Sequence, residues 1–373
     1  MWWLLRPSPS SASPETKAAH SRRLTDTLRG DFLFGISALS LFRAHASAHG
    51  TKIATDIVSV TADQGLKNWR RKILGTTTTR RTLLTTATAT AALALTGNPA
   101  QATPRTRNPA HTRLRELEEQ HGARVGAFAH NLGTKATVRY RASELFPMCS
   151  VFKTLAVAAV LRDLDDHGET LAKRIRYTAE FVEAAGGGAV TVRPENIASG
   201  LTVEELSDAA IRFSDNAAAN LLLSELGGPT AVTRFCRSLG DRTTRLDRWE
   251  PELNSAEPGR LEDTTTPGAI AHTYARLVLG NALNDEDRTR LTAWLLGNTT
   301  GGERLRKGLP QDWTVADKTG TGQYGTANDV GIAWTPDGTP VVVAVLTTKP
   351  DPAADADNPL VAGTATVLAD AVG

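Results

Sequence analysis

Segments with the apolar alternation of β-strands lie near both ends of the region from residue 103 onward, and a helical middle separates them. Val125–Ala129 and Thr137–Tyr140 form the first group, joined by a turn that contains Gly133. Val330–Trp334 and Val341–Leu346 form the second group, joined by a Pro-Asp-Gly hairpin sequence. We expect an α/β (α+β) fold: one antiparallel sheet formed by both chain ends and flanked by helices, plus an inserted all-helical subdomain. An active site at the junction of the two parts follows from this architecture.

The segments between the two groups of strands carry helical signals. Arg113–His121 is charged and amphipathic, so we expect it to pack on a face of the sheet. Ser150–Leu161 is mostly apolar and predicts a buried helix closed by Gly168. Further helices are predicted at 202–213, which opens with a capping box, and at 216–226, 231–239 and 361–371. Residues 241–266 lack periodicity, and a loop of that length in a compact domain is usually functional.

The charge of the chain is divided unevenly along its length. The net charge is +8 through residue 102 and −6 from residue 103 to the end, within an overall +2. A basic leader therefore precedes a mildly acidic globular part. The chain shows no concentration of basic residues in the globular part, so no nucleic-acid partner is expected.

The end of this leader has the organisation of an export signal. Thr79–Leu84 holds a twin arginine followed by apolar residues, and a weakly hydrophobic run, Ala87–Leu95, comes next. Ala100 and Ala102 fit an A-x-A cleavage site that exposes Thr103. We expect export through the twin-arginine translocation machinery to the cell envelope or the medium; the alternative is a Thr/Ala-rich linker with a chance arginine pair. No cysteine lies near the cleavage point, so a lipoprotein anchor is not supported.

Residues 1–75 have no evident role upstream of an export signal. Their apolar run Phe32–Phe42 is too short to span a bilayer, and no stable membrane anchor is expected. Ser/Pro-rich and basic stretches around it suggest disorder. Our hypothesis is a start codon assigned too early. The chain then divides into an extension at 1–75, a signal peptide at 76–102 and a catalytic domain at 103–373.

The two cysteines, Cys149 and Cys236, cannot build a disulfide scaffold. They could form one bridge outside the cytoplasm, but we expect free buried thiols. No group of His, Cys and Asp has the spacing of zinc ligands, so we expect neither a metal nor another cofactor. No apolar surface stripe stands out, which makes a monomer the default expectation.

Ser150-Val151-Phe152-Lys153 places a lysine one helical turn from a serine at the predicted start of a buried helix. A serine hydroxyl is a weak nucleophile until a neighbouring group takes its proton, and a desolvated lysine can do so. The amino end of the helix also offers N–H groups to a developing oxyanion. Alone the motif is weak, because a serine and a lysine three residues apart are common.

Two further motifs make chance improbable. Ser214-Asp215-Asn216 lies between two predicted helices, where it could equally be a capping turn, with Asp215 in a supporting role. Lys318-Thr319-Gly320 lies on a C-terminal strand, where Gly320 would let a substrate approach the backbone closely. The three motifs occur in the order S-x-x-K, S-D-N, K-T-G, each on the expected element.

Together these motifs resemble the penicillin-recognising serine enzymes, and the long loop narrows the resemblance to class A β-lactamases of the actinobacterial type. The loop reads Arg245-Leu246-Asp247-Arg248-Trp249-Glu250-Pro251-Glu252-Leu253-Asn254 and ends near Asp263-Thr264-Thr265-Thr266-Pro267. The resemblance runs from about Arg113 to the C-terminus. It implies the serine β-lactamase fold and the hydrolysis of β-lactam antibiotics through a serine acyl-enzyme, and hence β-lactam resistance.

The resemblance implies a role for each motif residue. Ser150 attacks the lactam carbonyl, and the N–H groups of Ser150 and Thr321 form the oxyanion hole. Either Lys153 or Glu250, acting through a water, takes the serine proton. Ser214 relays a proton to the leaving lactam nitrogen.

The remaining implied roles concern substrate binding. Asn216 would hydrogen-bond the side-chain amide of the substrate. Lys318, Thr319 and Thr321 would bind its carboxylate. Arg304 would assist them, because many relatives carry an arginine on the strand after K-T-G and this chain has none there; the alternative is a solvated surface arginine.

The loop residues are the ones that would make the enzyme a hydrolase. Glu250 and Asn254 would hold the water that attacks the acyl-enzyme, and Arg248 would pair with Asp263 across the neck of the loop. We leave the isomer of the peptide bond between Glu250 and Pro251 open. The Gly-rich stretch 184–188 suggests a soft rim at the mouth of the cleft.

Three other interpretations are weaker. A D-alanyl-D-alanine peptidase shares the three motifs but lacks the loop with Glu250 and Asn254. A non-enzymatic β-lactam sensor usually carries a transmembrane anchor. A serine esterase would need G-x-S-x-G and a catalytic histidine, and Ser150 has neither context.

Overall fold

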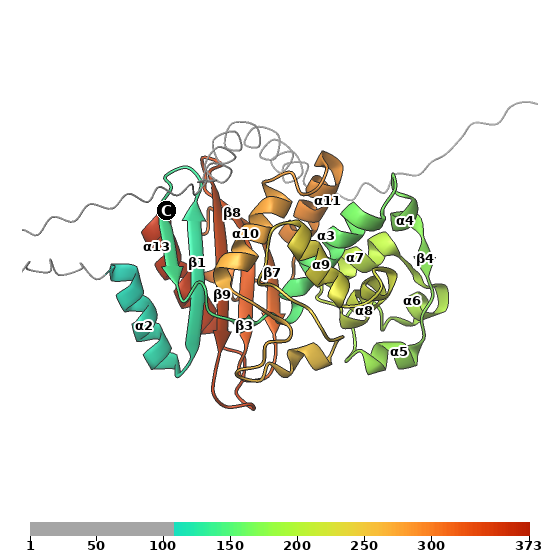
Figure 1. The fold of residues 1–373 in the computed structure, drawn as a ribbon, viewed down its shortest axis with the longest axis horizontal. Coiled ribbons are helices and arrows are strands. Elements are labelled where there is room, and N and C mark those ends of the chain that lie inside the picture. The colour runs from blue at the N-terminus through green and yellow to red at the C-terminus, as the bar shows by residue number, and fades with distance from the viewer. Residues whose placement is uncertain (1–107) are drawn as a thin grey trace, which may run out of the picture. The chain divides into compact units, whose positions relative to one another are not determined.

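The computed structural model describes residues 108–373. The extension and the signal peptide expected at 1–75 and 76–102 lie outside the described residues. The main sheet has five antiparallel strands in the order β2-β1-β9-β8-β7 (Figure 1). The strands are β1 (Arg124–Asn131), β2 (Thr137–Tyr140), β7 (Thr314–Thr321), β8 (Ala327–Trp334) and β9 (Pro340–Thr348).

The sheet joins the two ends of the described chain, as the sequence predicts. Strand β1 pairs with β9 along its whole length, so that Val125 lies opposite Thr347 and Ala129 opposite Val343. Both strands are buried at nearly every position, which explains their continuous apolar runs. The turn between β8 and β9 has Gly338 at a φ of 81°, a conformation that glycine adopts without strain.

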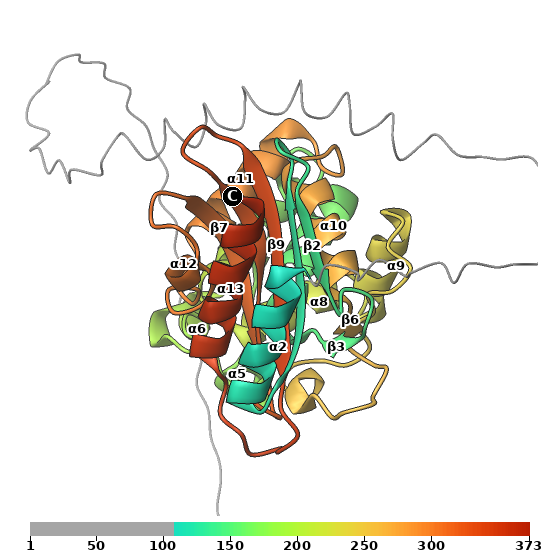
Figure 2. The same ribbon diagram turned by 90° about the vertical axis from the view of Figure 1, so that its left-hand side faces the viewer.

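Two helices from the chain ends cover one face of the sheet. Helix α2 (Pro109–His121) and helix α13 (Asn358–Val372) lie side by side there (Figure 2). The side chain of Asn108 caps the start of α2, and Gly122 ends it in the left-handed conformation. The buried Leu114 and Leu368 belong to the hydrophobic core between these helices and the sheet.

The opposite face of the sheet packs on helices that the sequence patterns did not predict. They are α10 (Pro267–Val278) and α11 (Asp285–Leu296), and α10 lies against β1, β8 and β9. Its Tyr274 is fully buried and donates a hydrogen bond from its hydroxyl to the carbonyl of Val151 at 3.0 Å. This contact ties the sheet to the helical part at the point where the predicted nucleophile lies.

The helical part forms around α3 (Phe152–Ala159), in which every residue is buried. Helices α7 (Val203–Arg212), α8 (Asn216–Glu225), α9 (Thr230–Ser238) and α11 pack against it (Figure 1). The predicted capping box at the start of α7 is present: Thr202 and Glu205 exchange hydrogen bonds with each other's backbone. Shorter elements complete this part: α4 (Glu169–Ala172), α5 (Ala179–Ala184), α6 (Pro194–Ser199), β4 (Arg174–Ile175) and β5 (Leu201–Thr202).

The expectation that Gly168 closes the helix after Ser150 is wrong. The segment begins with a 3-10 turn, η1 (Cys149–Val151), continues as α3 and ends in a π-type turn, η2 (Val160–Leu164). The chain leaves the helix at Asp165, which is extended, and Gly168 instead precedes α4. The carboxylate of Asp165 accepts the backbone N–H groups of Gly168 and Leu171, so the turn is stabilised by a side chain.

Both cysteines are free and buried, as expected. Burial raises the pKa of each thiol well above its usual value. Within residues 108–373, no helix has the length and apolar character needed to cross a bilayer.

Candidate active site

The predicted nucleophile lies in a turn that three other segments hold in place. Ser150 is buried in η1, directly after β3 (Phe146–Pro147). The Asn328 amide of β8 donates hydrogen bonds to the carbonyls of Pro147 and Met148, and the Met148 N–H donates to the carbonyl of Asp263 at 2.9 Å. Cys149 has a φ of 46°, a strained conformation for a residue with a side chain. The turn is therefore set by its surroundings.

The end of β7 lies against this turn, and Gly320 explains how it can. A Cβ atom at Gly320 would lie 2.8 Å from the Met148 carbonyl oxygen and 3.3 Å from the Cβ of Cys149. The glycine thus allows strand and turn to approach each other; it also lines the cavity beside Ser150, and its expected role in the approach of a substrate stays a prediction. Strand β7 brings Lys318, Thr319 and Thr321 to the same place.

Lys153 lies at the centre of the polar network and is completely buried. Its ammonium donates to the carbonyl of Ser214 at 2.7 Å and to the Oδ1 of Asn216 at 2.6 Å. It also lies 3.1 Å from the Oε1 of Glu250. Three donor hydrogens therefore meet three oxygen partners, and the buried charge is paired and hydrogen-bonded.

The carboxylate of Glu250 links the loop at 245–263 to the nucleophile. Ser150 donates a hydrogen bond from its hydroxyl to Glu250 Oε1 at 3.3 Å, and the Asn254 side-chain amide donates to Oε2. Asn220 of α8 holds the backbone of Glu250 from both sides: its Nδ2 donates to the carbonyl at 2.9 Å, and its Oδ1 accepts the N–H at 3.0 Å. The peptide bond between Glu250 and Pro251 is cis.

The loop is closed at its neck by Asp263. Its carboxylate lies 2.5 Å from the guanidinium Nε of Arg248 and accepts the N–H groups of Asp247 and Arg248 at 2.7 and 3.0 Å. Because the carbonyl of Asp263 also accepts from Met148, one residue connects the loop with the strand before the nucleophile. The loop contains a short 3-10 turn, η3 (Glu252–Ser255), and is followed by a two-residue strand, β6 (Thr264–Thr265), which pairs with β3.

Ser214 connects the two lysines of the site. It has a φ of 56°, and its hydroxyl accepts a hydrogen bond from the Lys318 ammonium at 2.9 Å while its carbonyl accepts from Lys153. Lys318 is fully buried, and this burial together with the charge of Lys153 lowers its pKa well below the usual value. Asp215 caps α8 and accepts hydrogen bonds from Val190 and Thr191, which fixes the loop beside the motif.

Arg304 is 6 % exposed, so the alternative of a solvated surface arginine is wrong. Its guanidinium donates to the carbonyls of Gly320 and Asn328, both at 2.8 Å, and to the Thr321 hydroxyl at 2.7 Å. Its Nε donates to Asn358 of α13 at 2.8 Å. Burial lowers its pKa, and the interaction with Asp329 opposes that effect.

These side chains surround a cavity of about 290 Å³. Residues from all three motifs, the loop and the segment before β7 line it: Ser150, Ser214, Asn216, Asn254, Thr300, Arg304, Thr319, Gly320 and Thr321. With Lys153 and Lys318 directly behind this lining and Arg304 in it, the walls carry cationic groups around a polar cavity. An anionic ligand with a carbonyl group near Ser150 fits such a site.

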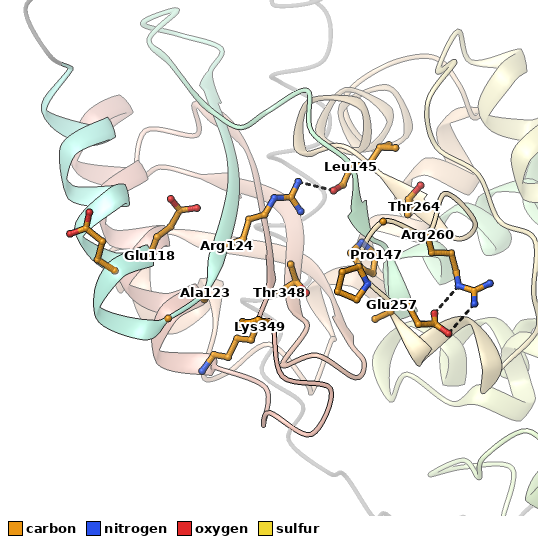
Figure 3. A pocket seen from close by; sticks show the side chains of 16 residues that line it. Glu118, Ala123, Arg124, Leu145, Pro147, Glu257, Arg260, Thr264, Thr348 and Lys349 are labelled. Carbon is orange, nitrogen blue, oxygen red and sulfur yellow. Dashed lines mark hydrogen bonds and ion pairs between the residues drawn. The ribbon is translucent and has the colours of Figure 1, made fainter.

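A larger cavity has a volume of about 650 Å³, and Figure 3 shows the side chains that line it. The end of α2, the start of β1, the end of β9 and the loop at 256–260 form it. Its cations are already paired: Arg124 with Glu144, Arg260 with Glu257 and Lys349 with Asp357. It holds none of the predicted motif residues, so the smaller cavity is the candidate active site.

Two residues of the site, Asn220 and Thr300, belong to none of the three motifs. Asn220 is a buried amide within the apolar stretch Ala217–Leu223 of α8, and an amide in such a stretch must find polar partners. Thr300 shares a hydrogen bond of 2.5 Å with Thr319. It belongs to a run of small polar residues, 298–302, in which no periodic pattern marks a functional position.

Solved β-lactamases share this fold. The structure of a β-lactamase from Streptomyces albus G is 61% identical, covers 71% of this chain and 100% of its own, and has a TM-score of 0.71. A β-lactamase from Desulfarculus baarsii DSM 2075 is 44% identical, covers 70% of this chain and 96% of its own, and has a TM-score of 0.67. The architecture is therefore the α/β fold of the β-lactamases.

Sequence comparison identifies the family. A β-lactamase of Streptomyces lavendulae is 67% identical over 70% of this chain and 86% of its own length, and one of Streptomyces fradiae is 63% identical over 70% and 85%. The model of the beta-lactamase enzyme family matches residues 109–371. The chain belongs to this family, and it is a hydrolase of β-lactams.

Proposed function

We propose that the protein is a class A serine β-lactamase that opens the lactam ring through an acyl-enzyme on Ser150 and releases the product with a water activated by Glu250. The observation that carries the proposal is the position of the Glu250 carboxylate. It lies 3.3 Å from the Ser150 hydroxyl and 3.1 Å from the Lys153 ammonium, with its backbone held by Asn220. Such a carboxylate can exchange protons with both groups.

Acylation begins when the Ser150 oxygen attacks the lactam carbonyl. Glu250 can accept the serine proton directly or through a water. Lys153 can take this role only after its ammonium has passed a proton to the Glu250 carboxylate 3.1 Å away. The N–H groups of Ser150 and Thr321 would stabilise the oxyanion, since Gly320 allows the end of β7 to lie against the nucleophile turn. Ser214, hydrogen-bonded to Lys318, would pass a proton to the departing lactam nitrogen.

The part of the cavity wall that carries Lys318 and Arg304, here called the cationic wall, selects the substrate. A β-lactam carries a carboxylate close to its ring, and Lys318, Arg304 and the hydroxyls of Thr319 and Thr321 offer charge-assisted hydrogen bonds to it. An anion bound beside Lys318 also favours the charged form of this buried lysine. The Nδ2 group of Asn216 remains available for the side-chain amide of the substrate, because its Oδ1 accepts from Lys153.

Hydrolysis of the acyl-enzyme needs a water next to Glu250. The Nδ2 of Asn254 donates to the Glu250 carboxylate, and its Oδ1 is buried without a hydrogen-bond partner among residues 108–373. A water between the two residues would donate one hydrogen to Asn254 and lose the other to Glu250 as it attacks the ester. This hydrolysis of the acyl-enzyme is what distinguishes a β-lactamase, which confers resistance, from a penicillin-binding target, which stays acylated.

The test uses the purified protein and an excess of a chromogenic cephalosporin. We expect many turnovers, and in Glu250→Ala a stoichiometric burst with the acyl group on a Ser150 peptide in the mass spectrum. Glu252→Ala removes an exposed glutamate from the same loop and serves as the control with unchanged turnover. A single burst from the unmutated protein would instead favour the sensor or the peptidase, and hydrolysis of a D-alanyl-D-alanine peptide would identify the latter.

Export is part of the proposal. The twin arginine at 80–81 and the A-x-A sequence that ends at Ala102 would direct the chain to the translocation machinery and release a monomer that begins at Thr103. N-terminal sequencing of the secreted protein tests the cleavage point, and light scattering tests the monomer. Peptides from residues 1–70 in cells would contradict the late translation start.

A further inference from the structure

We propose that Asp317 and Asp329, two buried carboxyl groups behind the cationic wall, share one proton and position Thr300 and Arg304 for binding the substrate carboxylate. This inference rests on the proposed function, in which Arg304 and Thr319 bind that carboxylate; Thr300 lines the same cavity and hydrogen-bonds Thr319. Neither aspartate lines the cavity. Both act through the segment 298–306, which precedes β7.

The two aspartates belong to neighbouring strands. Asp317 of β7 lies opposite Gly331, and Asp329 of β8 lies opposite Thr319, so the two side chains are diagonal neighbours in the β7–β8 pair. Both side chains are completely buried. Two ionised carboxylates in such a place would repel each other at low dielectric, and one of them must therefore be neutral.

The hydrogen bonds identify which carboxyl group holds the proton. The Oδ1 of Asp317 accepts from the Arg306 Nε at 2.6 Å, and its Oδ2 accepts from the Asn298 Nδ2 at 2.7 Å. The Oδ2 of Asp329 accepts the N–H of Leu305 at 3.0 Å, while its Oδ1 is buried and has no donor partner in the described part of the chain. A proton on Asp329, donated to Asp317, satisfies this last oxygen.

The electrostatics agree with this assignment. Burial raises the pKa of both carboxyl groups, and Asp329 is raised the more strongly because Asp317 lies beside it. The groups that face the pair are Arg304 and Arg306 of the segment, Lys318 of β7 and Tyr274 of α10. Burial keeps the phenol of Tyr274 neutral by raising its pKa. The pair therefore carries one negative charge rather than two, which leaves more positive potential at Arg304 and Lys318.

The pair fixes the segment at three points, which are Asn298, Leu305 and Arg306. Asn298, held by Asp317, uses its Oδ1 to accept from the N–H of Thr300 at 3.0 Å and from its hydroxyl at 2.8 Å. A Cβ at Gly301 would lie 1.9 Å from the Asp317 carboxylate, so the backbone runs directly over this group.

Asp329 holds the N–H of Leu305, immediately after Arg304. Thr300 and Arg304, which line the cavity, thus lie between Asn298 and Leu305. These are residues that the two carboxyl groups hold by hydrogen bonds. A shift of the segment would move both ligands together.

The two aspartates should respond differently to the same substitution. Asparagine at position 329 can still donate to Asp317 and accept from Leu305, so Asp329→Asn keeps the network and removes only the titration. Asparagine at position 317 has one acceptor oxygen for two donors and directs an N–H group at Arg306 or Asn298. Asp317→Asn should therefore displace the segment.

The experiment measures kcat and KM for a β-lactam carboxylate against pH in the full-length protein. For Asp317→Asn we expect KM to rise about tenfold or more with kcat within about threefold. For the unmutated protein KM should rise as alkaline pH ionises Asp329. In Asp329→Asn the neutral-pH KM should stay within about twofold, and the alkaline rise should shrink to the part that deprotonation of Lys318 causes. Asp312→Asn, at an exposed position before β7, is the control for the loss of one carboxylate.

Infrared spectroscopy tests the proton without using activity. The unmutated protein at neutral pH should show a carboxylic-acid carbonyl band that is absent from Asp329→Asn and present in Asp312→Asn. The proposal would be overturned if the unmutated protein lacked this band, and this test does not depend on whether Asp317→Asn folds. Equal effects of Asp317→Asn and Asp329→Asn on KM would overturn it as well. A protein that shows the band but only a single acylation burst would contradict the proposed function and leave the shared proton intact.

Discussion

The two walls of the cleft hold their polar side chains by different means. On one wall, Lys318–Thr321 lie on the sheet strand β7, whose ladder to β8 extends through them, and Arg304 binds two carbonyls of that ladder. On the other wall, Glu250 lies in a loop with little regular structure and is held by the side chains of Asn220, Asn254 and, at the neck, Asp263.

This difference suggests a division of labour. The strand wall presents a fixed cationic surface, which suits binding of a carboxylate. The loop wall places one carboxylate through several side-chain hydrogen bonds, so a single substitution can misplace it. We therefore expect changes in the loop wall to act on kcat through hydrolysis of the acyl-enzyme, and changes in the strand wall to act on KM.

The largest effect is expected for Asn220→Leu. This change keeps the approximate shape of the side chain but leaves the buried N–H and carbonyl of Glu250 without partners, at a cost of about 1–3 kcal/mol for each group. We expect kcat to fall on the order of 10³-fold with accumulation of the acyl-enzyme. Burst kinetics and mass spectrometry measure both.

The control is Ser224→Ala, an exposed position one turn further along α8, whose loss should leave kcat unchanged. A normal deacylation rate in Asn220→Leu would mean that the loop holds Glu250 without this clamp. The contrast between the two walls would then lose its main support.

A smaller loss is expected for Asp263→Asn at the neck of the loop. The neutral amide no longer offers a charge to Arg248 and has one acceptor oxygen where the carboxylate has two, so the neck should loosen. We expect deacylation to slow by about 10- to 100-fold and stability to fall by about 3 kcal/mol, as for other broken buried ion pairs. Rapid-quench measurement of the acyl-enzyme and denaturant unfolding test this, and an unchanged rate and substrate profile would show that the pair does not brace the water site.

The strand wall is tested by Arg304→Ala. Removing the guanidinium takes away charge-assisted hydrogen bonds of about 1.5–3 kcal/mol from the substrate carboxylate and the Thr321 hydroxyl. We expect KM to rise on the order of tenfold with kcat changed by less than about threefold. Lys307→Ala, which removes an exposed cation three residues away, controls for net charge. A fall in kcat with accumulated acyl-enzyme would contradict the assignment of binding to this wall.

The same contrast explains what the sequence could predict. The strands at both chain ends, the capping box and the three motifs depend on local patterns, and those patterns were sufficient for the fold class. Helices α10 and α11 were not predicted from the apolar pattern, although Thr266 and Asn284 are of the residue types that cap the start of a helix. The end of the helix after Ser150 was misplaced because Asp165, through side-chain hydrogen bonds, terminates it before a glycine is needed.

For the site, the sequence provides the residue types but not the hydrogen bonds that connect them. The motifs placed Ser150, Lys153 and Lys318 together. Asn216 turns its oxygen to Lys153, and Gly320 lies against the nucleophile turn. Both arrangements depend on contacts between segments more than 60 residues apart. Asn220 was detectable as an amide in an apolar helix, but its partner Glu250 lies 30 residues away in a loop, where no periodicity links them.

The smallest expected effect concerns how the stability of the fold depends on pH. Glu257 in the loop and Asp329 in the sheet should contribute slopes of opposite sign. Hydrogen bonds from Ser255 and Arg260 lower the pKa of Glu257 to about 2. A lowered pKa stabilises the fold above the ordinary carboxyl value, and this contribution disappears as the pH falls towards 2. Because Glu257 lies in an exposed part of the loop, we expect Glu257→Gln to cost less than about 1 kcal/mol at neutral pH and nothing at the acid end.

Asp329 in the sheet has a raised pKa, so its contribution to stability falls as the pH rises above the ordinary aspartate value, and Asp329→Asn should flatten that slope. Thermal unfolding across pH measures both variants, and slopes of the same sign would show that the two regions do not differ in this respect.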